Sequence, residues 1–279
     1  MPELLAEDGI GDLQRHLVCA QDVARTVGRY ALTFRESSGL DGLHVTAKGV
    51  QDFVTLVDRR AEEAIRDSLG KAFPEDGFLG EEFGGAASGN GYWVVDPIDG
   101  TSNYIRGLRH WGVSIAYVAG GAIRIGVVFD AANDRVYSAI ADRGAFRDGI
   151  PIRVSQVREP TEALSILGYS RRTDFGDYQA TTRRLHEMGI DYRRIGSAAV
   201  GLVRVADGIA DLYYERHVNI WDVLAGALIA REAGAVVQLP CLPELLTRGG
   251  PVIASTPCLA KQLAFLREEA AAECQLLEW

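Results

Sequence analysis

The chain has 279 residues, 47% of them apolar and 24% charged, and its formal net charge is −9. These proportions are typical of a globular protein with a substantial core, and they exclude a disordered chain. The acidic charge, with basic residues scattered rather than massed, argues against a nucleic-acid-binding surface.

The cysteines and the N-terminal sequence favour a cytoplasmic location. The four cysteines lie far apart and form no C-x-x-C pair, which is typical of reduced thiols rather than of a disulfide framework or a zinc site. The first residues are acidic and lack the basic and apolar regions of a secretory leader. Apolar stretches are interrupted well before 18 residues, so we expect a cytoplasmic protein without a membrane span.

The first part of the chain is predicted to begin with two helices. Apolar residues at helical spacing predict a long amphipathic helix over 10–36, and a loop is expected over 39–49. A second helix is expected from 55 to 72. A short strand near Phe78 and a glycine-rich loop over 84–91 follow.

Strand signals dominate the next part. A short apolar strand over 92–95 leads directly into Asp96. Two strands over 111–118 and 122–129 flank a Gly-Gly pair, which is a hairpin signal. Further strands of the same sheet are expected over 136–140 and 150–154.

The second half alternates strands and helices, which predicts an α/β arrangement after an α+β first half. The sequence therefore suggests two halves, 1–150 and 151–279, with the boundary near 145–160. The expected elements are strands over 164–167, 209–214, 236–237 and 252–253, helices over 175–188, 197–206 and 221–233, and a closing helix after Thr256.

The segment Asp96-Pro97-Ile98-Asp99-Gly100-Thr101 is the main candidate for a functional site. Proline sets the direction in which the chain leaves the strand. A tight turn would then aim the carboxylates of Asp96 and Asp99 at one point and leave the Ile98 carbonyl available as a third oxygen ligand. Such hard ligands suit Mg²⁺ or Mn²⁺ rather than zinc.

The end of this segment suits a phosphate. Gly100 lets the backbone approach a ligand closely, and Thr101 is expected to start a short helix whose amide groups would favour an anion. The alternative is that the segment is a turn with solvated carboxylates, because Asp, Pro and Gly also form turns for purely conformational reasons.

Four further acidic residues have both a structural and a functional interpretation. Glu81 lies in an acidic pair after the strand near Phe78, and Glu215 ends a strand; both would be solvated in the simpler interpretation. Asp58 and Asp222 fall at the starts of helices, where a carboxylate commonly caps the helix or interacts with its dipole.

In their order and spacing these pieces resemble the inositol monophosphatase family of Mg²⁺-dependent, Li⁺-sensitive phosphatases. The resemblance spans residues 45 to 260, and the motifs around Asp99 and Asp222 are the specific ones. The matching stretches are 52–58, 80–82, 93–103, 196–199, 207–215 and 221–226.

The resemblance implies a five-layer αβαβα sandwich of the inositol monophosphatase/fructose-1,6-bisphosphatase type, with the site between the halves and a homodimeric assembly. It implies two or three Mg²⁺ ions, with Mn²⁺ as a possible substitute. Glu81, Asp96 and the Ile98 carbonyl match ligands of the first ion. Asp96, Asp99 and Asp222 match ligands of the second, and Glu81 also matches a ligand of a third, weaker ion.

The catalytic and substrate-binding roles are likewise implied by the resemblance. Asp58 and Thr101 match the pair that orients and deprotonates the attacking water. The positions that match substrate contacts are Glu81, Ile98, Asp99, Gly100, Thr101, Gly196, Ser197, Ala198, Glu215 and Asp222.

The expected activity is hydrolysis of inositol 1-phosphate or a similar small sugar or polyol phosphate by a metal-activated water. Alternatives with the same chemistry are histidinol-phosphate phosphatase, 3′,5′-bisphosphate nucleotidase and fructose-1,6-bisphosphatase. An alternative of another class is a regulatory, RNA-polymerase-associated binding protein on the same scaffold. Arg216 and His217 should lie near the non-phosphate end of a substrate, whereas Arg193 and Arg194 suit a substrate, a partner subunit or the open surface equally.

Overall fold

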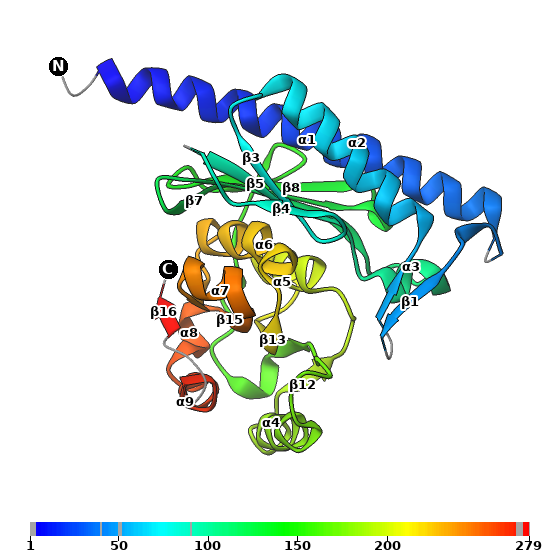
Figure 1. Cartoon of the computed structure of the whole chain (residues 1–279). Coiled ribbons are helices and arrows are strands. Elements are labelled where there is room, and N and C mark those ends of the chain that lie inside the picture. Colours follow the sequence, from blue (N-terminus) through cyan, green and yellow to red (C-terminus); the bar gives the residue numbers. More distant parts are fainter. Residues whose placement is uncertain (1–3, 40, 50–51, 90, 272–275, 279) are drawn as a thin grey trace.

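The computed structural model describes residues 4–39, 41–49, 52–89, 91–271 and 276–278. It shows two large β-sheets with helices between and outside them (Figure 1). Helices α1 (Leu4–Ser38) and α2 (Leu56–Ala72) lie side by side on the outer face of the first sheet. Helices α5 (Ala198–Ala206) and α6 (Ile220–Glu232) lie between the two sheets.

The first sheet has, in the part of the chain described, eight strands in the order β10-β9-β8-β7-β6-β5-β3-β4. Neighbouring strands are antiparallel except β3 and β5, which are parallel. The strands are β3 (Gly77–Gly80), β4 (Gly84–Ala86), β5 (Gly91–Asp99), β6 (Gly112–Ala119), β7 (Ala122–Asp130), β8 (Arg135–Ile140), β9 (Ala145–Arg147) and β10 (Ile150–Ile152).

The second sheet has six strands among the described residues, in the order β12-β11-β13-β15-β14-β16. Strands β12, β11 and β13 are parallel, so their carboxyl ends meet at one edge of the sheet. The strands are β11 (Leu164–Leu167), β12 (Asp191–Arg193), β13 (Leu212–Val218), β14 (Val236–Pro240), β15 (Gly250–Ser255) and β16 (Leu276–Glu278).

Three hydrophobic clusters fill the spaces between the layers. One joins α1 and α2 to the first sheet, a second surrounds α5 and α6, and a third lies on the outer face of the second sheet. That outer face is covered by α4 (Phe175–Glu187), α8 (Pro257–Ala260) and α9 (Ala264–Ala271). The order helix, sheet, helix, sheet, helix confirms the predicted five-layer αβαβα fold.

Helix α6 shows why this order is stable. Nearly every residue from Val223 to Ala230 is buried, so the helix has no polar face over that stretch. A helix that is apolar all round requires cover on both sides, and here the two sheets provide it. Within the described residues, no helix combines the length and the apolar character needed to cross a bilayer.

The expected loop over 39–49 is wrong in part. This stretch contains a short 3₁₀ turn, Asp41–Leu43, and the strand β1 (Thr46–Gly49), which pairs with β2 (Asp52–Val54). The glycine-rich loop over 84–91 likewise begins with a strand, β4, on the edge of the first sheet. Strands of three or four residues are too short to show a period, and their pairing partners define them. Helix α7 (Leu242–Arg248) was not predicted either.

Candidate metal centre and catalytic site

A cleft of about 1030 Å³ lies between the two halves of the chain. Five carboxylate residues line it, three from the first half and two from the second. They are Glu81, Asp96, Asp99, Glu215 and Asp222. The structure therefore brings all the predicted acidic ligands to one cavity.

A β-bulge, and not the predicted tight turn, orients Asp96 and Asp99. On β5, Asp96 lies opposite Ser114 of β6 and Asp99 lies opposite Gly112, so three residues of β5 advance against two of β6. In a regular strand, residues three apart face opposite sides; the extra residue of the bulge places both carboxylates on the same side. Pro97 lies inside this bulge, where its missing N–H costs no ladder hydrogen bond.

Asp96, Asp99 and Asp222 form the centre of the cluster. Each offers a carboxylate oxygen, and the three oxygens lie within 4.8 Å of one another. The Ser114 hydroxyl, directly across from Asp96, donates a 3.0 Å hydrogen bond to the carbonyl of Trp221. This bond fixes the first turn of α6 against the first sheet and thereby brings Asp222 to the other two carboxylates.

Asp222 and Asp58 each cap the start of a helix, and each also lies at the carboxylate cluster. The amide of Asn219 donates to Asp222 Oδ2 at 2.8 Å, and the amide of Thr55 donates to Asp58 Oδ2 at 2.8 Å. In each case the capping bond holds the side chain in one orientation. The prediction that these two carboxylates cap helices is therefore confirmed. Capping does not prevent them from also taking part in a functional site.

Glu81 lies beside Asp96 because the Glu81 amide donates a 3.2 Å hydrogen bond to the carbonyl of Val95. The Ile98 carbonyl oxygen lies 2.9 Å from the Thr101 hydroxyl oxygen, and at least one of its two lone pairs is available to a cation. The donor set around the cluster consists of carboxylate and carbonyl oxygens, which fits Mg²⁺ or Mn²⁺.

The electrostatics of the cluster suit a bound cation. Burial, and then the neighbouring charge of Glu81, raise the pKa of Asp96 and of Asp222 well above its ordinary value. Burial also raises the pKa of Asp99 to about 6, although hydrogen bonds from the start of α5 oppose the shift. Carboxylates that repel one another in a buried site are stabilised when a divalent cation binds between them.

Asp58 and Thr101 form a hydrogen-bonded pair at the edge of the cluster. Asp58 is completely buried, and its Oδ1 lies 3.1 Å from the Thr101 hydroxyl. Burial raises the pKa of Asp58 to about 6. The carboxylate is therefore ionised at neutral pH and can accept a proton by way of the threonine.

The start of α5 is bound to Asp99 from the other half of the chain. The Ser197 hydroxyl and the Ala199 amide (2.8 Å) donate to Asp99 Oδ2, and the Ala198 amide donates to Oδ1 at 3.3 Å. Gly196 precedes this turn with φ +75°. The structure thus brings the predicted substrate contacts 196–198 together with the predicted metal ligands.

Asn103 also joins the two halves; it falls in the matching stretch 93–103, but no role was predicted for it. Its side-chain amide lies 2.6 Å from the His110 carbonyl and 2.7 Å from the Ile195 carbonyl, and it is 9% exposed. It holds the loop before α5 against α3 (Thr101–Arg106). Its position two residues after Thr101 was the available signal, but a contact across the halves is not visible in a single sequence.

Glu215 lies on β13, at the edge where the parallel strands end. The Tyr213 hydroxyl donates to Glu215 Oε2 at 2.7 Å. Burial raises the pKa of Glu215 to about 7, and the charge of Arg194 lowers it in part. A side chain at Gly168, just after β11, would collide with the Glu215 carboxylate, so this glycine provides space for it.

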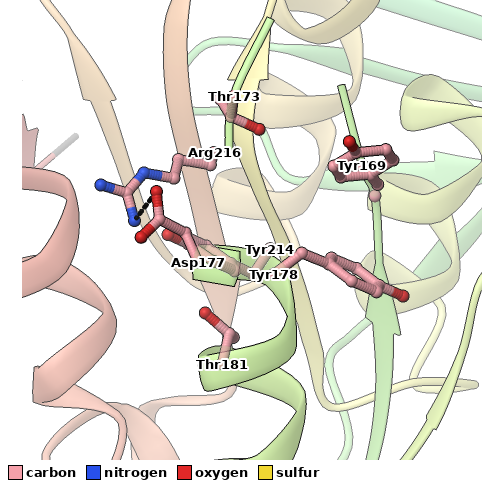
Figure 2. A pocket seen from close by; sticks show the side chains of 8 residues that line it. Tyr169, Thr173, Asp177, Tyr178, Thr181, Tyr214 and Arg216 are labelled. Atoms are coloured by element: carbon pink, nitrogen blue, oxygen red, sulfur yellow. Dashed lines mark ion pairs between the residues drawn. The ribbon is translucent and has the colours of Figure 1, made fainter. Parts of the chain in front are cut away.

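The four basic residues noted in the sequence separate into different environments. Arg194 and His217 line the cleft, whereas the exposed Arg193 forms an ion pair with Asp191 at 2.8 Å. Arg216 instead pairs with Asp177 of α4 at 3.3 Å, in a small pocket beside the cleft (Figure 2).

We expect Gly100→Ala to damage the site because this glycine lies where the two halves approach. Its φ is +91°, and an added Cβ would lie 2.9 Å from the His110 carbonyl oxygen and 3.2 Å from that of Gly196. The strain and the contact together should lower the free energy of unfolding by about 2–4 kcal/mol.

The matched control is Gly121→Ala, at φ +74° with no atom within 4 Å of the added Cβ. It carries the backbone strain without the contact, so it should lose only about 1 kcal/mol in urea unfolding. Equal losses in the two variants would show that the close approach at Gly100 is unimportant.

Comparisons with known proteins agree with this arrangement. The family model described as "Inositol monophosphatase family" matches residues 12–272. An inositol-1-monophosphatase of Mycobacterium bovis is 40% identical over 259 residues, covering 88% of this chain and 89% of that protein. A Nus factor SuhB of Pseudomonas aeruginosa is 36% identical over 264 residues, covering 91% and 97%.

A solved structure shows the same fold. The extragenic suppressor protein SuhB from Bartonella henselae superimposes with a TM-score of 0.82 at 32% identity, covering 89% of this chain and 96% of that one.

Proposed function

Because this chain belongs to the inositol monophosphatase family, we propose that it is a Mg²⁺-dependent phosphomonoesterase. Its substrate would be inositol 1-phosphate or a similar small sugar or polyol phosphate. The observation that carries the proposal is the convergence of Asp96, Asp99 and Asp222 to within 4.8 Å beside the Asp58–Thr101 pair. The other expected phosphate esters remain alternatives within the same chemistry.

The metal ligands are assigned from the donors that face the cleft. Glu81, Asp96 and the Ile98 carbonyl would hold one ion, and Asp96, Asp99 and Asp222 a second; a third ion would use Glu81. Bound Mg²⁺ would neutralise the phosphoryl oxygens and lower the pKa of a coordinated water. The raised pKa values of Asp96 and Asp222 support this assignment, because they indicate carboxylates without a counter-charge.

Asp58 and Thr101 would orient and deprotonate the attacking water. The capping bond from Thr55 keeps Asp58 Oδ2 occupied, so Oδ1 is the oxygen that faces Thr101. Thr101 can donate its proton to Asp58 and accept one from water, which relays the water proton to the buried carboxylate. No covalent intermediate on the protein is needed.

Substrate contacts are proposed on both sides of the cleft. The Ser197 hydroxyl and the Ala198 amide, which bind Asp99, would become available to substrate as Asp99 turns to metal. Glu215 would contact a hydroxyl at the end away from the phosphate. The full set is Glu81, Ile98, Asp99, Gly100, Thr101, Gly196, Ser197, Ala198, Glu215 and Asp222.

We also propose the organisation of the active molecule. The halves 1–150 and 151–279 would act as units, the first supplying most metal ligands and the second supplying Asp222 and most substrate contacts. The assembly would be a homodimer in the cytoplasm. Light scattering after gel filtration would give twice the mass of 30.3 kDa, and a single-chain mass would contradict the dimer.

Phosphate release tests the activity. We expect release from inositol 1-phosphate, or from another member of a panel of sugar, nucleotide and histidinol phosphates, to require Mg²⁺ and to be inhibited by Li⁺. Activity should fall to background in EDTA and return with added Mg²⁺ or Mn²⁺. If the pure protein released no phosphate from any member with Mg²⁺ present, the enzyme proposal would be wrong.

A regulatory role is a second candidate, because several relatives 34–38% identical to this chain are named Nus factors. The carboxylate cluster favours catalysis, but the two roles are compatible on one scaffold. A folded Asp99→Asn chain that still performed the cellular function of the wild type would indicate the regulatory role.

A further inference from the structure

The outer part of the cleft differs in character from the carboxylate cluster. Three arginines, Arg171, Arg172 and Arg194, line it together with Tyr169 and Phe175. All three arginines are exposed, and none forms an ion pair with a carboxylate in the described part of the chain. A concentration of unpaired guanidinium groups in one cleft is unexpected in a protein with a net charge of −9.

The sheet topology brings these residues together. The loop after β11 carries Tyr169, Arg171 and Arg172, and the residue directly after β12 is Arg194. Strands β12, β11 and β13 are parallel, so both loops leave the same edge of the second sheet, next to Glu215 of β13. This edge faces the cleft that the metal cluster occupies.

Side-chain contacts hold this part of the cleft in place. The guanidinium carbon of Arg194 lies 6.0 Å from the ring centre of Tyr169, and Arg172 donates to Asn219 Oδ1 at 3.0 Å. The ion pair between Arg216 and Asp177 fixes the first turn of α4 to β13 (Figure 2). Phe175 belongs to the same turn of α4 and lines the cleft. Phe175 is nevertheless 53% exposed, and an aromatic ring exposed at the rim of a cleft can contact a ligand.

We propose that Arg171, Arg172 and Arg194 form a subsite for a second anionic group of the substrate, so that this chain prefers phosphate esters carrying a further phosphate. The inference rests on the proposed phosphatase activity and specifies its substrate class. The reacting phosphate would lie at the metal cluster, and the second phosphate would lie among the arginines. Guanidinium groups bind phosphate through two parallel hydrogen bonds. Within the described residues none of the three forms an ion pair, and the charge of Arg194 acts on the nearby Glu215 only to lower its pKa in part.

The size of the cleft supports a substrate with two anionic ends. Its volume of about 1030 Å³ is at the upper end of the range for small-molecule sites. Tyr169 and Phe175 would contact the organic part between the two phosphates. The ring faces suit either a sugar or a nucleobase, and the experiment distinguishes these two.

The test compares substrates that differ by one phosphate. The pairs are fructose 1,6-bisphosphate with fructose 1-phosphate, and adenosine 3′,5′-bisphosphate with adenosine 3′-monophosphate, each with Mg²⁺. We expect kcat/KM to be about tenfold or more higher for the bisphosphate of at least one pair, which corresponds to one or two charge-assisted bonds. This preference should shrink as NaCl is raised, because the arginines are exposed.

Substitutions of the arginines then test whether these residues cause the preference for bisphosphates. Arg194→Gln, and the double change Arg171→Gln with Arg172→Gln, should each reduce the bisphosphate-to-monophosphate ratio of kcat/KM about five- to tenfold. Arg193→Gln removes the same charge one residue away, but its side chain pairs with Asp191 outside the cleft, so the ratio should not change.

Two results would overturn the subsite: ratios near one for both pairs, or equal effects of the variants on both members of a pair. In either case, Mg²⁺-dependent release from the monophosphates would leave the proposed phosphatase activity standing. If no phosphate were released from any substrate, the phosphatase proposal itself would fail.

Discussion

We expect Asp99→Asn to lower Mg²⁺-dependent phosphate release by about 10³-fold or more while the protein stays folded. The change removes one charge from the three carboxylates that lie within 4.8 Å of one another. An asparagine has nearly the same shape, and its oxygen can still accept from the Ser197 hydroxyl and the Ala199 amide. The bond between the two halves should therefore remain, and only the affinity of the cluster for cations should fall.

The same substitution should not destabilise the metal-free protein. Burial raises the pKa of Asp99, so its ionised carboxylate is less stable in the folded protein than in water. In EDTA at neutral pH, the Tm of the variant should equal or exceed that of the wild type. Stabilisation by Mg²⁺ should be largely lost.

The control for this experiment is Asp67→Asn, the same chemical change on the exposed face of α2. It should leave turnover and the Mg²⁺-dependent rise in Tm unchanged. Wild-type turnover in Asp99→Asn would show that Asp99 is no metal ligand. A lower Tm in EDTA would show instead that its charge stabilises the fold.

The long elements and the acidic residues of the site could be predicted from the sequence because each has a local signal. The buried faces of α1 and α2 repeat at helical spacing, and Asp96 and Asp99 follow an apolar strand. The five-layer order came from resemblance to a family, and periodicity alone gives no order of layers.

The parts that could not be predicted depend on contacts between distant segments. The bulge that turns Asp96 and Asp99 to one side is defined by their register against β6. The bond from Ser114 to the Trp221 carbonyl spans 107 positions, and that from Asn103 to the Ile195 carbonyl spans 92. A serine or an asparagine has no local pattern that reveals such a partner, so these positioning residues emerged only from the structure.

The arginines illustrate the same limit. In the sequence, Arg193 and Arg194 are neighbours, and nothing distinguishes which of them contacts a substrate. Consecutive residues at the end of a strand have side chains that face opposite sides of the sheet. The structure accordingly places Arg194 in the cleft and pairs Arg193 with Asp191.

The stability of the metal-free protein should fall as the pH rises from about 4 to about 7. In the folded protein the pKa of Asp58 and of Asp99 is about 6, that of Glu215 is about 7, and Asp96 and Asp222 are also raised. The ordinary values are 3.8 for Asp and 4.5 for Glu. Between the ordinary and the raised pKa the folded state binds more protons than the unfolded state, so raising the pH favours unfolding.

Mg²⁺ should reverse this loss, and do so mainly at the higher pH, because protons and cations compete for the same carboxylates. The shift at Asp99 alone corresponds to about 3 kcal/mol, so the combined effect is large compared with the stability of a typical domain. Thermal unfolding at pH 5 and pH 7.5, in EDTA and in Mg²⁺, measures how the stabilisation by Mg²⁺ depends on pH. We expect Mg²⁺ to raise the Tm by several degrees at pH 7.5 and by little at pH 5. An equal rise at both values would mean that the carboxylates are not the groups that bind the cation.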